Sequence, residues 1–200
     1  MKKILHVILI SLFSLTVISC AKKSDSSSTT SSGLFIAVGM SGVILTSSDG
    51  TTWTSRTSGS SQGMWNILYG NSTFVAVGNS GTILTSSDGI TWTSRTSGTT
   101  EDLFGITYEN STFVVVGDNS SGSGTILTSA DGITWTSRTS GTTNSLWDVN
   151  YGNNKFVLSD GAGGIQSSSD GISWTSRVGI DTYGIWGGAY GNSKFVVASQ

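Results

Sequence analysis

The chain has 200 residues, with ten lysines and arginines against twelve aspartates and glutamates, and a formal net charge of −2 at pH 7. Nucleic-acid binding requires clustered cations that displace counterions, and the cations of residues 34–200 are few and dispersed, so this class of protein is excluded. The only histidine is His6, inside a predicted leader, and the only cysteine is Cys20. A histidine-dependent catalytic triad and a histidine metal site are therefore excluded.

The first predicted element is an export signal at residues 1–19. Two lysines precede an apolar run that is too short to span a bilayer comfortably, and two more lysines follow it, which favours a cleaved signal over a transmembrane helix. The block Val17-Ile18-Ser19-Cys20 resembles the lipobox of bacterial lipoproteins, where cleavage precedes a cysteine that is acylated. The resemblance implies lipidation of Cys20 and a membrane-tethered protein of the bacterial cell envelope, at the outer membrane or cell surface. The alternative is an ordinary signal followed by an incidental thiol.

Residues 20–33 are polar and rich in serine and threonine, which predicts a flexible linker after the lipidated cysteine. Residues 34–200 then form the only folded domain, and this length is enough to bury most of its apolar surface.

A sequence motif of the form S-x-D-G-x-[ST]-W occurs four times in this domain. Its tryptophans are separated by 39, 43 and 39 residues, and four tyrosines repeat in step with them (Trp53, Trp92, Trp135, Trp174; Tyr69, Tyr108, Tyr151, Tyr190). A period of about 40 residues is the length of one supersecondary unit that must stack on its neighbours to bury its apolar face.

Within the second unit, four short strands are predicted at residues 65–69, 74–78, 82–86 and 92–96. Each run is rich in β-branched and aromatic residues, and glycine, asparagine and aspartate separate the runs. Alternation places Trp65, Ile67 and Tyr69 on one face of the first strand. Four antiparallel strands per unit predict an all-β fold, a β-propeller of about four four-stranded blades. A β-solenoid normally has a shorter period, and a β-sandwich does not need such close repetition.

Closure of the ring is open at this point. The domain begins with a strand of the second type at 34–39 and ends with strands of the first and second types at 185–190 and 195–199. These last strands could complete the first blade. The alternatives are a five-unit ring with incomplete first and last blades, a dimer that makes a larger ring, and a chain shortened from a longer parent.

The repeated motif resembles the Asp-box, or BNR, repeat of sialidases and of photosystem II assembly-factor-like propellers, and the resemblance covers residues 34–200. It implies that each box forms the hairpin between the third and fourth strands, that its serine and aspartate bond turn amides, that its glycine takes the tight conformation, and that its tryptophan packs between sheets. In the usual box the aromatic residue stands five positions after the aspartate. In this chain it stands four positions after it, which implies a shorter turn. The structural positions implied are Ser47, Asp49, Gly50, Trp53, Ser86, Asp88, Gly89, Trp92, Ser129, Asp131, Gly132, Trp135, Ser168, Asp170, Gly171 and Trp174.

No catalytic residue, metal site or cofactor is predicted. The box aspartates lie in different blades, far apart around a ring, and have nearby backbone amides to satisfy them. A sialidase needs a tyrosine nucleophile backed by a glutamate and an acidic proton donor, but the only glutamates, Glu101 and Glu109, fall in opposite sets of loops. Four arginines recur with the repeat at outer-strand positions, where a structural pairing or a solvated role is expected (Arg56, Arg95, Arg138, Arg177).

Differences between the repeats are concentrated on one of the two faces of the propeller. The connections between blades and the loops after each second strand vary, and a four-residue insertion within 118–124 falls there too. Loops on a rigid scaffold often carry recognition residues, although unconstrained drift produces the same variation. The candidate binding face comprises Glu101, Asp102, Asp118, Asn119, Asn144 and Asp181.

Together these features predict a lipid-anchored cell-envelope propeller that acts as a non-catalytic binding or scaffold module for an unidentified protein or glycan. A homo-oligomer is expected if the ring is incomplete. A glycan-binding lectin is the alternative, and it requires exposed tryptophans, whereas the four box tryptophans are expected to be buried. A degenerate sialidase-like glycosidase requires convergent carboxylates, which the sequence does not supply.

Overall fold

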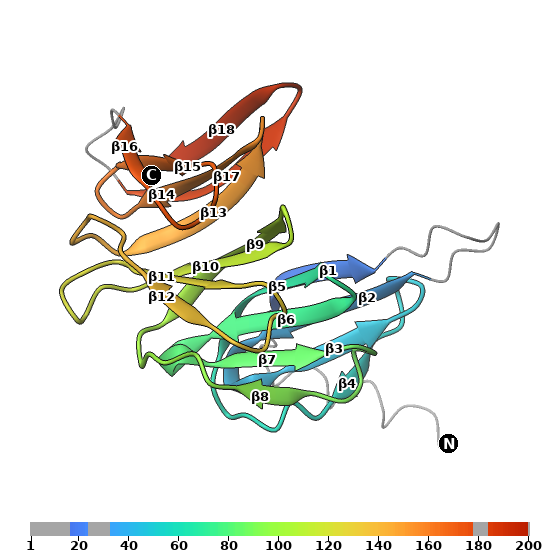
Figure 1. Cartoon of the computed structure of the whole chain (residues 1–200). Coiled ribbons are helices and arrows are strands. Elements are labelled where there is room, and N and C mark those ends of the chain that lie inside the picture. The colour runs from blue at the N-terminus through green and yellow to red at the C-terminus, as the bar shows by residue number, and fades with distance from the viewer. Residues whose placement is uncertain (1–16, 24–32, 178–183, 200) are drawn as a thin grey trace, which may run out of the picture.

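Strands β1 to β18 and two 3-10 turns make up the regular structure of the computed structural model, which describes residues 17–23, 33–177 and 184–199 (Figure 1). The strands form four antiparallel sheets of four strands and one sheet of two strands. Within each sheet the strands pair with their neighbours in chain order. The fold is therefore all-β and of the propeller type, as the period of the repeats predicted.

The first sheet contains β1 (Val17–Lys23), β2 (Leu34–Gly39), β3 (Ile44–Ser47) and β4 (Thr54–Arg56). The second contains β5 (Met64–Gly70), β6 (Thr73–Gly78), β7 (Ile83–Ser86) and β8 (Thr93–Arg95). The third contains β9 (Leu103–Glu109), β10 (Thr112–Gly117), β11 (Thr125–Ser129) and β12 (Thr136–Arg138). The fourth contains β13 (Leu146–Gly152), β14 (Lys155–Asp160), β15 (Ile165–Ser168) and β16 (Thr175–Arg177), and the last contains β17 (Ile185–Gly191) and β18 (Lys194–Ser199). The 3-10 turns are η1 (Met40–Gly42) and η2 (Asn79–Gly81).

The hairpin between the first and second strands is closed by a two-residue turn in which both residues have positive φ. In the second sheet these residues are Asn71 (φ 47°) and Ser72 (φ 58°). A turn with two left-handed residues matches the right-handed twist of the flanking strands, and asparagine tolerates that conformation better than most residues. The recurring asparagine after each first strand is explained by this turn.

The hydrophobic core lies between the sheets as three clusters, one at each interface between consecutive four-stranded sheets. In the second, third and fourth sheets, the second strand contributes side chains to the core, and its phenylalanine is fully buried (Phe74, Phe113, Phe156). The Asp-box tryptophans pack against these clusters from the later blade: Trp92 against the first, Trp135 against the second and Trp174 against the third. Each blade therefore covers the core that it shares with the preceding blade.

Burial decreases toward the last sheet. The valine after the buried phenylalanine is fully buried in β6 and β10 (Val75, Val114), half-buried in β14 (Val157) and 64% exposed in β18 (Val196). The reason is that this side chain faces the next blade, and in the described residues no sheet follows β17 and β18. One face of the last sheet is therefore uncovered.

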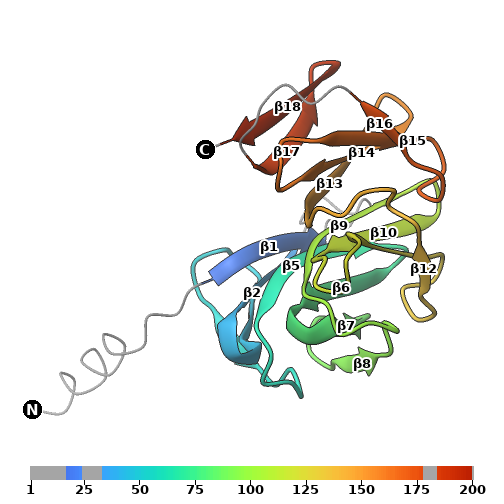
Figure 2. The same ribbon diagram turned by 90° about the vertical axis from the view of Figure 1, so that its left-hand side faces the viewer.

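The last two strands do not complete the first blade. They form a separate sheet that packs against β13, while β1 occupies the innermost position of the first sheet and pairs antiparallel with β2 (Figure 2). The proposal that the C-terminal strands complete the first blade is therefore wrong for the described part of the chain, because β1 already fills that position.

Strand β1 also crosses the predicted boundary at residue 20. Cys20 pairs with Ala37 in this strand, so residues 20–23 are part of the sheet and not of a flexible linker. Residues 1–16 and 24–32, which include the rest of the predicted signal and linker, lie outside the described residues. Cleavage and acylation at Cys20 stay predictions. Within the described ranges, the structure contains no helix of the length and apolar character needed to cross a membrane.

Candidate binding site on the variable face

The two faces of the propeller are distinguished by hydrogen bonds between neighbouring blades. On one face, a turn between first and second strands meets an Asp-box, where Asn71 Nδ2 donates to the Ala130 carbonyl oxygen at 3.3 Å. On the other, the loop after a second strand meets a connection between blades, where the Gly81 N–H donates to the Glu101 carbonyl oxygen at 2.8 Å. We call the second one the variable face. It carries the loops in which the repeats differ.

The Asp-box residues satisfy one another within their turn. In the second blade, Ser86 Oγ donates to Asp88 Oδ1 at 2.9 Å and accepts from the Gly89 N–H at 2.8 Å. The same carboxylate oxygen accepts the N–H groups of Ile90 and Thr91, each at 2.8 Å. Gly89 has a φ of 74°, the left-handed region that favours glycine. The four-residue spacing therefore still permits the turn bonds that the resemblance implied.

These contacts stabilise the charged form of the box carboxylates. The backbone N–H groups of Thr91 and Ile90, followed by the Ser86 hydroxyl, lower the pKa of Asp88 to about 2. Equivalent contacts hold the pKa of Asp49, Asp131 and Asp170 below its usual value. A carboxylate held in this way is not a proton donor at neutral pH.

The box tryptophans are more exposed than expected. Trp92, Trp135 and Trp174 are half-buried, and each donates its indole N–H to the carbonyl oxygen of the box glycine, for example Trp92 to Gly89 at 3.2 Å. Trp53 is 38% exposed, because no described blade precedes the first. The expectation that all four are buried is therefore wrong: Trp92, Trp135 and Trp174 pack on the core with part of the indole and expose the rest, and Trp53 is exposed.

The repeated arginines pair with the third strand of their own sheet. Each donates from Nε at 2.8 Å to a side-chain hydroxyl ten residues earlier in the chain (Arg56 to Thr46, Arg95 to Thr85, Arg138 to Thr128, Arg177 to Ser167). They stand on the outermost strands, far from the inner wall of the propeller.

Several residues of the predicted binding face cross-link neighbouring loops. Glu101 is buried and its carboxylate accepts from both the N–H and the hydroxyl of Ser120. Asp118 accepts from the Ser145 hydroxyl at 2.6 Å, and Asn119 donates to the Thr143 carbonyl oxygen. Glu101 and Asp118 therefore hold the inserted loop against the adjacent connections.

The remaining residues of that prediction have different surroundings. Asn144 donates to Asp160 at 3.0 Å, and Asp102 accepts the Ser80 N–H at 2.8 Å. Asp181 lies outside the described residues.

The most distinctive feature of the variable face is a row of aromatic side chains that the sequence analysis did not identify. The second residue of each of four first strands is aromatic: Trp65 in β5, Phe104 in β9, Trp147 in β13 and Trp186 in β17. The ring centroids lie 5.9 Å apart for the first pair and 4.7 Å apart for each of the next two pairs. The first strands of consecutive blades pack side by side, so the row runs along the inner wall.

A β-bulge accounts for the direction of these side chains. The register of each first strand shifts at the aromatic residue, for example between Met64 and Asn66 in β5 and between Leu146 and Asp148 in β13. A bulge inserts one unpaired residue and redirects its side chain. Met64 and Ile67 are buried in the core between the blades, whereas Trp65 belongs to the inner row. The predicted alternation that placed Trp65 on the same face as Ile67 is broken by the bulge.

A cavity of about 620 Å³ lies along this row. The four aromatic residues line it together with three polar residues, Asn66, Asp102 and Asp148. Asp148 is fully engaged, since it accepts the Val149 N–H at 2.9 Å, the Asn150 side-chain amide at 2.7 Å and the Gly188 N–H at 2.8 Å. No lysine or arginine lines the cavity among the described residues. The cavity therefore combines an aromatic wall with two carboxylates.

An adjoining cavity of about 360 Å³ shares Trp147 and Trp186 with the first and is lined also by Asn119 and Asn144. Asp102, Asn119 and Asn144 of the predicted face thus lie around the aromatic row. Trp186 is 57% exposed, so the last ring of the row is accessible to a ligand.

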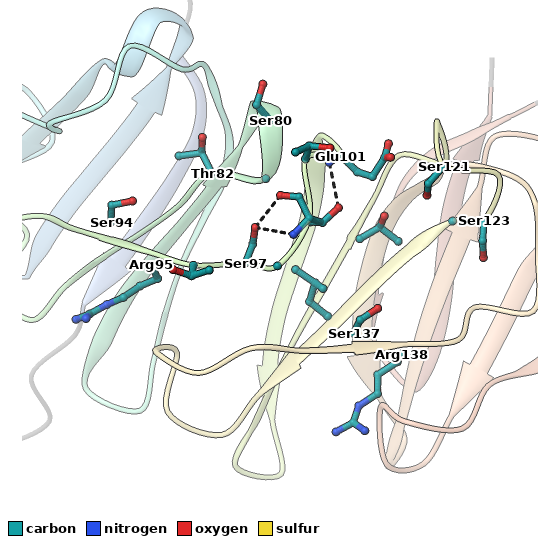
Figure 3. A pocket seen from close by; sticks show the side chains of 18 residues that line it. Ser80, Thr82, Ser94, Arg95, Ser97, Glu101, Ser121, Ser123, Ser137 and Arg138 are labelled. Carbon is teal, nitrogen blue, oxygen red and sulfur yellow. Dashed lines mark hydrogen bonds between the residues drawn. The ribbon is translucent and has the colours of Figure 1, made fainter.

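A third cavity, of about 780 Å³, opens between the second and third blades and is rich in hydroxyl groups (Figure 3). In this view the Glu101 side chain points toward the loop of Ser121, and Arg95 and Arg138 extend away from the hydroxyl-bearing side chains. Its serines and threonines bond loop backbone, as Ser97 does with Thr99. No aromatic residue lines it, and its one carboxylate is engaged with Ser120. Over the described ranges, no group of three or more potential metal ligands is found.

Comparisons with known proteins support the fold and do not assign a family. No protein-family description matches the sequence, and no curated protein matches it. The structure is similar to that of YCF48 from Cyanidioschyzon merolae (TM-score 0.60, 16% identity, covering 83% of this chain and 63% of that one). It is also similar to YCF48 bound to a D1 peptide (TM-score 0.67, 16% identity, covering 92% of this chain and 61% of that one).

A third similar structure is a GH74 enzyme of Niastella koreensis (TM-score 0.56, 24% identity, covering 82% of this chain and 24% of that one). The chain thus spans about three fifths of the two YCF48 chains and about a quarter of the enzyme. At these identities the likeness establishes the propeller fold alone.

Proposed function

We propose that this protein is a non-catalytic, lipid-anchored module of the bacterial cell envelope that binds a polypeptide at the aromatic row of the variable face. The observation that carries the proposal is the repeated bulge, which directs four aromatic side chains out of the core and into one open cavity. The rings contact one another, and the row also leaves apolar surface accessible to a ligand, most of all at Trp186, which is 57% exposed.

The composition of the cavity suits a protein ligand. Tryptophan is enriched among the residues that dominate binding energy in protein interfaces, because it offers a large, rigid contact area. The connections around the row are cross-linked by Glu101, Asp118 and Asn119, so the site is held in place before a ligand arrives. The similarity in fold to YCF48 bound to a D1 peptide supports a peptide as the ligand.

The absence of catalysis is part of the proposal and rests on the carboxylates. Glu101 lies in a connection of the variable face, while Glu109 lies at the end of β9, next to the turn on the opposite face. The two cannot act on one glycosidic bond, because acid and base must flank it within about 10 Å. Asp102 and Asp148 do line one cavity, but both oxygens of Asp148 already accept hydrogen bonds within the protein, so we assign this carboxylate a structural role. The box aspartates are bound by turn amides in separate blades.

The proposal is tested by selecting binders from a phage-displayed library of random decapeptides with the purified full chain. We expect enriched peptides whose affinity drops at least about tenfold in Trp186→Ala, since hot-spot truncations cost about 2 kcal/mol or more and about 1.4 kcal/mol corresponds to tenfold. Ile172→Ala is the matched control, because it truncates a similarly exposed apolar residue (45% exposed) at an Asp-box turn on the opposite face. Enriched peptides that bind both variants equally well would contradict the assignment of the site.

A glycan is the second candidate ligand, and the exposure of Trp186 favours it specifically. A flat, accessible indole stacks on a sugar ring as well as on a peptide side chain. If the library yields no binder while a neutral hexasaccharide binds the wild type and not Trp186→Ala, the protein is a lectin and the polypeptide proposal fails.

Lipid anchoring is proposed from the resemblance of residues 17–20 to a lipobox. Cleavage before Cys20 would remove Val17, Ile18 and Ser19 from β1 and leave residues 20–23 of this strand to pair with β2. Metabolic labelling with a palmitate analogue should tag the wild type and leave Cys20→Ser unlabelled, because Cys20 is the only cysteine of the chain. Two or more acyl chains, at about 0.8 kcal/mol per buried methylene, suffice for stable membrane attachment. Equal labelling of the two proteins would contradict lipid attachment at Cys20.

A further inference from the structure

Besides its aromatic wall, the cavity carries two carboxylates, and they differ in the number of hydrogen bonds that they accept from the protein. Asp148 is saturated by three donors and serves mainly to tie β13 to β17. Asp102 accepts a single hydrogen bond through Oδ1, from the Ser80 N–H, and its Oδ2 accepts none from the described residues. Asp102 is half-buried and lines the cavity, so its Oδ2 is available to accept a hydrogen bond from a ligand.

The rings next to Asp102 have a geometry that differs from the rest of the row. Phe104 and Trp147 are stacked, with an interplanar angle of 15°, so each covers a face of the other. Trp65 and Phe104 meet at 76°, edge to face, which leaves a corner between two nearly perpendicular rings. Asp102 precedes the first residue of β9 and Phe104 is the second, so the carboxylate and this corner lie close along the chain and line the same cavity.

The charged residues that line the cavity are both acidic. The basic residues in the described ranges are the four outer-strand arginines, Lys22 and Lys23 at the end of β1, Lys155 at the turn on the opposite face and Lys194 next to the equivalent turn of the last sheet. None of them lines the cavity, so neither carboxylate has a cationic partner there. Aromatic faces attract cations through their quadrupole, and a low-exposure carboxylate adds to this attraction.

We infer that this corner binds a cationic side chain of the polypeptide ligand, and that the cation is an arginine. The guanidinium plane stacks on the indole of Trp65 or the ring of Phe104, while its N–H groups donate to Asp102. An arginine fits better than a lysine, because its flat fork can stack and donate to a carboxylate at the same time. This inference rests on the proposed function and specifies the ligand that the site selects.

The test uses peptides enriched from the decapeptide library, each resynthesised with its arginine replaced by citrulline, which keeps the shape and removes the charge. We expect arginine to be over-represented among the enriched peptides relative to the starting library. Citrulline should weaken binding to the wild-type chain by about tenfold or more, consistent with a cation–π contact joined to a charged hydrogen bond. The arginine peptide should also bind less tightly as salt is raised.

Two protein variants complete the test. In Asp102→Asn, the amide oxygen can still accept the Ser80 N–H, so the fold is retained, but the penalty for citrulline should fall to about threefold or less, because the charge pair is already lost. Glu109→Gln is the matched control: it removes one carboxylate on the opposite face and should leave the full citrulline penalty. Arginine methylamide, but not citrulline methylamide, should compete with the peptide.

The possible outcomes separate the two proposals. If peptides are enriched without arginine or lysine, lose affinity in Trp186→Ala and bind Asp102→Asn unchanged, the cation inference is overturned while polypeptide binding stands. If lysine replaces arginine throughout, the cation is confirmed and the preference for a guanidinium is wrong. If no peptide is enriched, both proposals fail.

Discussion

At the scale of single residues, the Asp-box is a small self-contained turn. One carboxylate oxygen collects two backbone N–H groups and a hydroxyl, and the glycine takes a positive φ, in all four copies. The resemblance to known boxes was therefore informative about hydrogen bonding even though the spacing to the tryptophan is shorter. It was less informative about the tryptophan, whose exposure depends on whether a neighbouring blade is present.

The lowered pKa of the box carboxylates predicts an acid-sensitive fold. The folded-state pKa of Asp88 is about 2, below the value of about 4 in an unfolded chain. The unfolded state therefore binds more protons between these values, and the free energy of unfolding should fall as pH drops from about 4 to about 2. Urea unfolding at a series of pH values measures this slope. Asp88→Asn should have a shallower slope than Ser87→Ala, an exposed neighbour in the same turn; equal slopes would refute the role of Asp88.

At the scale of strands and sheets, the period of the repeats predicted the strands of the second, third and fourth blades, because turn residues and β-branched runs alternate regularly there. It did not predict β1, whose residues resemble a leader sequence and contain neither the aromatic second residue nor the tyrosine of the other first strands. Nor did it predict the aromatic row, although Trp65, Phe104, Trp147 and Trp186 repeat with the same separations as the box tryptophans. A β-bulge breaks the alternation from which side-chain direction was inferred.

The uncovered face of the last sheet gives a test at this scale with a matched pair of positions. Val114 and Val196 occupy equivalent places in β10 and β18, but Val114 is fully buried against the fourth blade and Val196 is 64% exposed. Val114→Ala should lower the free energy of unfolding by about 2 kcal/mol, from lost methyl groups and the cavity left behind. Val196→Ala should change it by no more than about 0.5 kcal/mol. Urea titration of both variants measures the difference, and similar losses would mean that β18 is covered in solution.

At the scale of the whole molecule, the two faces of the propeller carry different features. The face of the Asp-boxes repeats the same bonded turn four times. The variable face holds the aromatic row, the Asp102 carboxylate and the inserted loop, and these elements come from consecutive blades that the shared core keeps in fixed relation. The binding site that we propose is built from several blades, and for this reason no short sequence motif marks it.

Hydrogen exchange of backbone amides, with and without a peptide from the library, tests this division of the molecule most directly. Protection should appear at the starts of β9, β13 and β17 and in the connections at 98–102 and 141–145, while the Asp-box turns at 86–92 and 129–135 exchange at unchanged rates. Protection of the box turns, with the connections and the aromatic row unchanged, would contradict the central claim that the variable face is where this protein binds its ligand.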